Sequence, residues 1–259
     1  LFVKNQVQWA ARPLTDEEIG RFKRAQRATG IRVVFAHSTY LINLATPAEA
    51  DWRRAVDAFA DELERAEALG LRFAVIHPGS HKGSGLDAGI SRIVRALDEL
   101  TTRTRGYRVK IVLENTAGAG HTVGARFEEL QAILDGVASP ERLGICLDTC
   151  HLFAAGYDIR TPAGYARTLE ACETTVGARS ILAFHLNDAK APLGSGLDRH
   201  EHIGKGRIGL GAFRRLLNDR RFARVPMVLE TPKDDDADLR NLRTLRRLRG
   251  SRCGTTRRQ

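Results

Sequence analysis

The chain has 259 residues, of which 42% are hydrophobic and 28% charged, and this composition fits one large globular domain or two small ones. No apolar run reaches the length of a membrane span and no signal peptide is visible, so a membrane-spanning class is excluded and a cytoplasmic protein is expected. The formal net charge of +10 suits a polyanionic partner such as nucleic acid, although an arginine-rich source proteome would produce the same excess.

Strand-like and helical patterns alternate along the first half of the chain. A strand-like run at residues 1–5 precedes a helix over 16–28, for which Thr15 and Glu18 form a capping box. A strand at 31–36 leads to a helix that is expected to open at Thr46-Pro47 and to stop at Gly70. Further strands are expected at 71–76, 109–113 and 143–147, with helices near 90–100 and 127–134.

The same alternation continues to the end of the chain. Thr161-Pro162 predicts the start of a helix that runs to about residue 176, and a strand follows at 181–184. A glycine-rich, charged loop at 189–209 leads to a short helix near 212–218 and a strand at 226–229. The last helix carries leucines at steps of three from Leu239 to Leu248.

These elements make seven strand–helix units, and strands that are apolar throughout are typical of a parallel α/β sheet buried on both faces. Seven units favour an eight-stranded (β/α)8 barrel that lacks its first strand–helix unit. A doubly wound open sheet is the alternative, but no Gly-x-Gly-x-x-Gly sequence follows any strand.

A metal-binding type of side chain stands at the end of six strands in succession. In chain order these residues are His37, His77, Glu114, Asp148, His185 and Glu230. The carboxyl ends of barrel strands open on one face, which is where active sites of this architecture lie. A single histidine there is more often structural, but six in a row indicate one shared cavity. Packed carboxylates stay ionised only with a counter-charge, and mixed His/carboxylate sets suit zinc, manganese or iron.

Loop residues add three more candidates: His151, which lies three residues after Asp148, and the pair Asp198 and His200. The whole set exceeds one tetrahedral site and therefore predicts two or three metal ions, with Glu114 as a candidate bridge. Multi-metal sites stabilise the attacking and leaving oxygens in phosphodiester hydrolysis. Together with the basic charge, this chemistry favours nucleic acid as the substrate.

Several motifs across nearly the whole chain resemble those of one known family, in the family's order. They are KNQ at 4–6, HSTYLINL at 37–44, HPGSH at 77–81, ENTAG at 114–118, DTCHLFAAGYD at 148–158, HLNDAK at 185–190, DRHEHIG at 198–204 and LETP at 229–232. On these residues the chain resembles endonuclease IV, the family-2 apurinic/apyrimidinic (AP) endonucleases, also called deoxyribonuclease IV.

The resemblance implies a TIM barrel with a trinuclear zinc cluster, part of which could hold Mn²⁺ instead. His37, His77 and Glu114 would hold one zinc. Glu114 would bridge to a second zinc, which Asp148, His185 and Glu230 would also hold. His151, Asp198 and His200 would hold the third. Glu114, Asp148 and Glu230 would be the catalytic carboxylates.

The activity that the resemblance implies is hydrolysis of double-stranded DNA 5′ to abasic sites, leaving a 3′-hydroxyl, in base excision repair, with trimming of blocked 3′ ends. Tyr40 and Leu41 match the loop with which the family wedges DNA. Lys4 and Asn5 belong to a second DNA-binding segment, in which Val7 stands where the family often has arginine.

The expected organisation is one monomeric barrel domain at residues 1–249, without the strand and helix that precede the KNQ motif in the family, and a basic tail at 250–259. Two other interpretations stay open. A metal-dependent sugar isomerase or epimerase of the same barrel type would not need the set of His151, Asp198 and His200. A catalytically dead abasic-DNA-binding protein would bind DNA without cleaving it.

Overall fold

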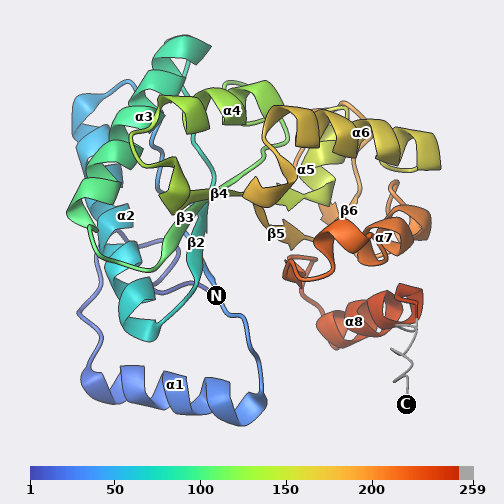
Figure 1. Ribbon diagram of the computed structural model, residues 1–259, viewed down its shortest axis with the longest axis horizontal. Coiled ribbons are helices and arrows are strands. Elements are labelled where there is room, and N and C mark those ends of the chain that lie inside the picture. Colours follow the sequence, from blue (N-terminus) through green and yellow to red (C-terminus); the bar gives the residue numbers. More distant parts are fainter. Residues whose placement is uncertain (251–259) are drawn as a thin grey trace, which may run out of the picture.

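The computed structural model describes residues 1–250, which form a curled parallel sheet with helices along its outer side (Figure 1). The sheet contains β1 (Ala36–His37), β2 (Phe73–Ile76), β3 (Lys110–Glu114), β4 (Leu143–Asp148), β5 (Ile181–His185) and β8 (Met227–Val228), in the order β1-β2-β3-β4-β5-β8. All neighbouring strands are parallel. The sheet is a half-barrel, which confirms the predicted barrel class.

The connections between these strands are mainly helical. The helices are α1 (Asp16–Thr29), α2 (Glu49–Leu69), α3 (Leu86–Arg103), α4 (Phe127–Gly136), α5 (Thr149–Ala154), α6 (Pro162–Thr175), α7 (Leu210–Leu217) and α8 (Ala237–Leu248), with short 3-10 turns η1 (Pro140–Arg142), η2 (Ala178–Ser180) and η3 (Arg220–Phe222). A separate antiparallel pair consists of β6 (Asp188–Ala189) and β7 (His200–Glu201). No helix among the described residues is long and apolar enough to cross a membrane.

The sheet has six strands where the sequence predicts seven, and residues 1–5 form none of them. Leu1 makes two ladder-like contacts with the start of the sheet: its amine donates to the Phe35 carbonyl at 3.0 Å, and its carbonyl accepts from the His37 N–H at 2.9 Å. The chain then turns away, and Lys4 is buried against α2. β1 and β8 are shorter than predicted because each has a neighbour on one side only within the described sheet.

Most helix boundaries follow the predicted signals. Thr15 and Glu18 form the capping box of α1, Gly70 ends α2 in the left-handed conformation, and Thr161 caps α6. The prediction that α2 opens at Thr46 is wrong, because its N-cap is Ala48, whose carbonyl accepts the Trp52 N–H of the first turn. The expected basic tail at 250–259 lies outside the described residues, except for Gly250.

Two apolar clusters hold the half-barrel together. The larger one fills the space between the sheet and the helices. The smaller one lies on the other, concave face of the sheet and consists of Phe35, Phe73, Val75, Val112, Cys146 and Ala183, with Val228 packed against it. Because successive side chains of a strand point to opposite faces, a residue two positions after a member of this cluster lies on the same concave face.

Candidate metal centre

The six strand-end residues all obey this two-residue rule. His37, His77 and Glu114 follow Phe35, Val75 and Val112 by two positions. Asp148, His185 and Glu230 likewise follow Cys146, Ala183 and Val228. The apolar cluster therefore lies beneath the metal-binding type of side chains, which share its concave face at the carboxyl ends of the strands.

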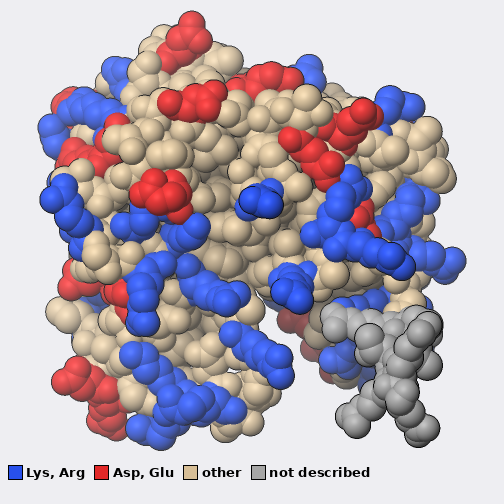
Figure 2. Space-filling model, viewed as in Figure 1, with Lys and Arg blue, Asp and Glu red and all other residues tan. Residues whose placement is uncertain are grey.

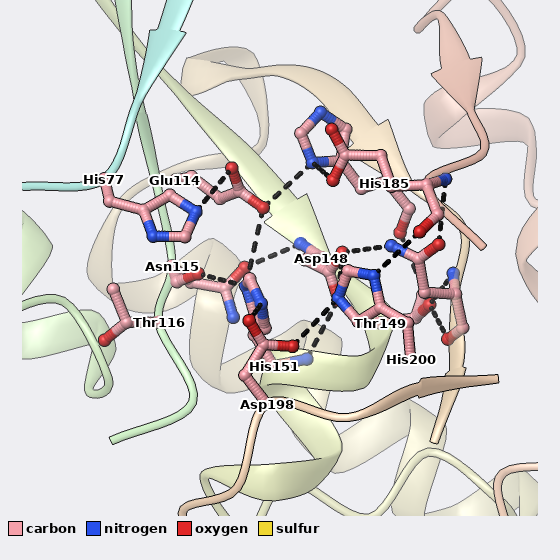
Figure 3. Close-up of polar contacts among 12 residues, drawn as sticks. His77, Glu114, Asn115, Thr116, Asp148, Thr149, His151, His185, Asp198 and His200 are labelled. Carbon is pink, nitrogen blue, oxygen red and sulfur yellow. Dashed lines mark hydrogen bonds and ion pairs between the residues drawn. The ribbon is translucent and has the colours of Figure 1, made fainter. Parts of the chain in front are cut away.

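Glu114 is fully buried and lies among the other ligand-type side chains, beside His77, His151 and His185 in Figure 3. Its Oε2 lies 2.9 Å from Nε2 of His37 and 3.2 Å from Nε2 of His77, and its Oε1 lies 2.8 Å from Nδ1 of His185. Burial alone would raise the pKa of Glu114, but His185, His77 and His37 outweigh that effect and hold the pKa well below its usual range. The carboxylate is therefore ionised and available as a ligand.

A second group of ligand atoms surrounds the other side of the same carboxylate. Glu114, Asp148, His185 and Glu230 each present an atom within 4.8 Å of the others, which is the distance range of one shared metal ion. Glu230 follows the neighbouring strand β8 by two residues, and its Oε2 lies 3.0 Å from Nδ1 of His185. The four residues are those that the resemblance assigns to the second zinc.

The third expected set combines His151 of α5 with Asp198, from the loop before β7, and His200 of β7. Asp198 lies between the two histidines: its carboxylate is 3.2 Å from Nε2 of His151 and 3.0 Å from Nε2 of His200. Burial lowers the pKa of both histidines, but the carboxylates outweigh it. Asp148, Asp198 and Glu114 raise the pKa of His151 to about 10, and Asp148 and Asp198 raise that of His200 to about 9.

The groupings of ligand atoms differ in part from the expected sets. His37 and His77 both contact Glu114, but the tight groups among the described residues pair His37 with His185, and His77 with His151, around that carboxylate. Cys150, a buried residue outside the expected sets, lies within 4.8 Å of the ligand atoms of Asp198 and His200. Only the folded loop reveals this proximity, because Cys150 and Asp198 are far apart in sequence.

Two asparagines orient the carboxylates and the backbone of the centre. The Asp148 N–H donates to Oδ1 of Asn115 at 2.7 Å. Asn187 donates its side-chain N–H to Oδ2 of Asp148 at 2.5 Å and accepts the Glu230 N–H at 2.9 Å. Asp148 also accepts the His151 N–H at 2.9 Å and so caps α5, a helix that was not predicted from the sequence although Asp is a preferred N-cap residue.

The residues expected to contact DNA lie in different environments. Tyr40 is 72% exposed beside the centre, with its ring centroid 6.4 Å from that of His37, and Leu41 is half-buried. Asn5 is exposed, as is Val7. Lys4 is not at the surface: its ammonium donates to the Ala58 carbonyl at 3.0 Å and to Asp61 at 3.1 Å.

Fold and centre together define a barrel protein with a clustered His/carboxylate site, and the family model described as "Xylose isomerase-like TIM barrel" matches residues 1–249. A curated relative from Chloroflexus aurantiacus, named probable endonuclease 4, is 48% identical over 250 residues, which are 96% of this chain and 88% of the relative. The solved endonuclease IV of Thermus thermophilus is 36% identical with a TM-score of 0.82, over 95% of this chain and 87% of that one. The chain belongs to the endonuclease IV family and is an endonuclease.

Solved structures of other functions share the architecture. A D-tagatose 3-epimerase-like protein superimposes with a TM-score of 0.72 over 90% of this chain and 83% of that one, at 21% identity. At this identity the likeness shows the fold alone.

Proposed function

We propose that the protein is a zinc-dependent AP endonuclease that hydrolyses double-stranded DNA 5′ to abasic sites and leaves a 3′-hydroxyl, in base excision repair in the cytoplasm. The proposal includes trimming of blocked 3′ ends and a monomeric barrel domain at residues 1–249. The observation that carries it is the buried Glu114 carboxylate, contacted by histidines of three strands, in a chain with relatives named endonuclease 4.

Some nitrogen donor atoms of the centre have no hydrogen-bond partner in the protein and are available to bind metal ions. Nε2 of His151 and Nε2 of His200 are buried and have no hydrogen-bond partner among the described residues, although each lies close to the Asp198 carboxylate. Nitrogen and carboxylate donors of this kind suit zinc, and Mn²⁺ in part of the sites. When bound, the metal ions supply Lewis-acid stabilisation of the charge that develops at phosphorus.

The charge of the centre gives a reason why a phosphodiester would bind to the metal-loaded protein. Glu114, Asp148, Asp198 and Glu230 place four carboxylates in one cavity. In the metal-free protein these carboxylates are paired with protonated histidines such as His151 and His200, whereas bound metal ions would place positive charge where the phosphate must lie. In this proposal Glu114, Asp148 and Glu230 are the carboxylates of the catalytic centre, and the nine predicted ligands hold the metals.

The basic surface and the exposed Tyr40 beside the centre are consistent with a DNA substrate. Lys and Arg side chains gather over α1 and α7 on the face drawn in Figure 2. Tyr40 projects from the turn that follows β1, beside His37, and Leu41 adjoins it. We propose that these two side chains wedge the duplex beside the abasic site and that Asn5 contacts the backbone of the DNA.

Incubation with a synthetic duplex that contains one abasic site tests this function. We expect incision on the 5′ side of the site, loss of incision after chelation, and recovery when zinc is added. An intact duplex of the same sequence is the control. Turnover of ketose sugars without incision would instead support an epimerase, and tight binding without cleavage by the zinc-loaded protein would support a dead DNA-binding protein.

A further inference from the structure

The loop that carries Asp198 and His200 is closed at its base by backbone pairing. Asp188 and Ala189 of β6 pair antiparallel with Glu201 and His200 of β7. The Lys190 N–H also donates to the carbonyl of Arg199 at 2.9 Å. Asp198 itself is exposed over 47% of its side chain, so packing in the core does not hold it in place.

The Asp188 carboxylate lies beneath this closure and is completely buried. Its Oδ1 accepts the N–H groups of Ala189 and Ile208, both at 2.9 Å. Its Oδ2 accepts the N–H groups of Gly204 at 2.9 Å and Gly209 at 3.3 Å. A buried charge of this kind is stable only when its lone pairs are satisfied, and here four backbone donors satisfy them.

The returning chain wraps closely around that carboxylate. A Cβ atom on Gly206 would lie 2.5 Å from Oδ1 of Asp188 and 2.5 Å from the Ala189 carbonyl oxygen. The Arg207 N–H donates to the same Ala189 carbonyl at 2.8 Å. These contacts fix residues 204–209 against β6. Because β7 lies only a few residues earlier in the chain, it is fixed with them.

The neighbouring residue serves a different part of the centre. Asn187 holds the Asp148 carboxylate and the Glu230 backbone, which belong to the ligand group around Glu114. Asp188 contacts none of the nine candidate ligand side chains by a hydrogen bond within the described residues. Asn187 thus acts on Asp148, which lies near Glu114 and also near His151 and His200, whereas Asp188 acts on the hairpin that carries Asp198 and His200.

We propose that Asp188 is the positioning residue of the third ligand set, because its four backbone hydrogen bonds fix the hairpin that brings Asp198 and His200 to His151. The inference rests on the proposed zinc centre. It assigns a selective role: loss of the Asp188 charge releases the third metal and leaves the group around Glu114 intact. Residues outside the ligand set that hold ligands in place typically contribute about 10- to 100-fold to metal affinity.

The test measures zinc per chain by mass spectrometry after dialysis, for wild type, Asp188→Asn and Asn187→Ala. We expect Asp188→Asn to weaken the third site alone by about 10- to 100-fold, with one zinc fewer per chain. Asn187→Ala should weaken the group around Glu114 instead. Retention of all zinc by Asp188→Asn, or equal loss from every site, would overturn the inference.

Hydrogen exchange of the metal-free proteins gives a readout that does not depend on zinc. Asp188→Asn should speed exchange at the amides of Gly204, Ile208 and Gly209, while the amides of β3 and β4 keep their protection. Unchanged exchange at these three amides would contradict the inference. If Asp188→Asn does not fold, Gly206→Ala offers a second variant, because its added methyl group would collide with Oδ1 of Asp188. This variant should cause the same selective loss of zinc. Retention of the third zinc by Gly206→Ala would overturn the inference. If the wild type binds fewer than three zinc ions while Asp188→Asn still speeds exchange at these three amides, the zinc centre is contradicted but the role of Asp188 in the hairpin is not.

Discussion

Asp148 and His185 occupy the same register position at the ends of the adjacent strands β4 and β5. Their side chains therefore start side by side on the concave face, and strand pairing alone brings a carboxylate and an imidazole together. Glu114 pairs with Cys146, two residues before Asp148, so it lies deeper at the adjacent strand. Strand pairing thus places most of the candidate ligands, and the loops supply the remaining ones.

Glu114→Ala removes the one carboxylate that His37, His77 and His185 all contact. We expect metal content and incision of abasic DNA to fall together, with incision reduced at least about 100-fold, because the proposed bridge between two metal ions would be lost. Metal analysis and a single-turnover incision assay check this. Glu67→Ala, at the opposite end of the barrel where Glu67 accepts the Arg108 and Val109 N–H groups, is the matched control. Near-wild-type incision by Glu114→Ala would refute the assignment.

Zinc binding to the metal-free protein should release protons at pH 8. The pKa of His151 is raised to about 10 and that of His200 to about 9, so both are protonated at this pH, whereas a zinc ligand must be neutral. Calorimetry in two buffers of different ionisation enthalpy measures the release. A binding heat that is the same in both buffers would contradict these protonation states.

The same two histidines set a pH dependence for the stability of the metal-free protein. Their folded pKa values lie above the ordinary value of 6.5, so their ion pairs stabilise the fold fully below about pH 6.5. This stabilisation is lost as the pH rises through about 9 and 10. Thermal unfolding in chelator should therefore show a falling Tm across this range, and His151→Gln should flatten the fall. A metal-free wild type with a constant Tm would contradict the pairing.

Much of the centre could be predicted from the sequence because it follows from strand ends. Each apolar run ends directly before its ligand, and the alternation of side chains along a strand decides which face the ligand takes. The role of Asp188 could not be predicted, since its partners are backbone N–H groups up to 21 residues away. The hairpin of β6 and β7 was hidden for the same reason: a two-residue pairing leaves no periodic pattern in a glycine-rich loop.

Lys4 shows the limit of an argument from motifs alone. A lysine in a DNA-binding segment suggests a phosphate contact, but this side chain is fully buried between Asp61 and Glu62 of α2. Burial raises the pKa of Glu62 and the nearby Lys4 opposes that effect, so the two groups depend on each other. Only tertiary packing decides whether a lysine in this segment faces solvent or the core.

Lys4→Met should therefore act on stability and not directly on DNA. Removing one partner of a buried ion pair leaves the other uncompensated, which costs about 3–5 kcal/mol in the free energy of unfolding. Urea unfolding measures this cost, and Lys233→Met, which breaks an exposed pair with Asp238, should cost at most about 1 kcal/mol. A Lys4→Met protein that is fully stable but binds DNA more weakly would contradict this account and support a phosphate contact by Lys4.

Val7→Arg should raise the affinity for abasic DNA. Val7 is 75% exposed in the turn after Asn5, so an arginine there can reach the duplex without displacing core residues. One added phosphate contact steepens the salt dependence of binding by about one unit. Fluorescence anisotropy at several salt concentrations measures both effects. Leu239→Arg adds the same charge on α8, and an equal gain from that variant would show that Val7 is not at the DNA.

The most direct test of the central claim is zinc-edge anomalous diffraction from crystals of the zinc-loaded protein. The three-metal centre predicts three anomalous peaks in the cavity: one beside His37 and His77, one among Asp148, His185 and Glu230, and one beside His151, Asp198 and His200. A single peak, or two peaks with the third ligand set empty, would contradict the account.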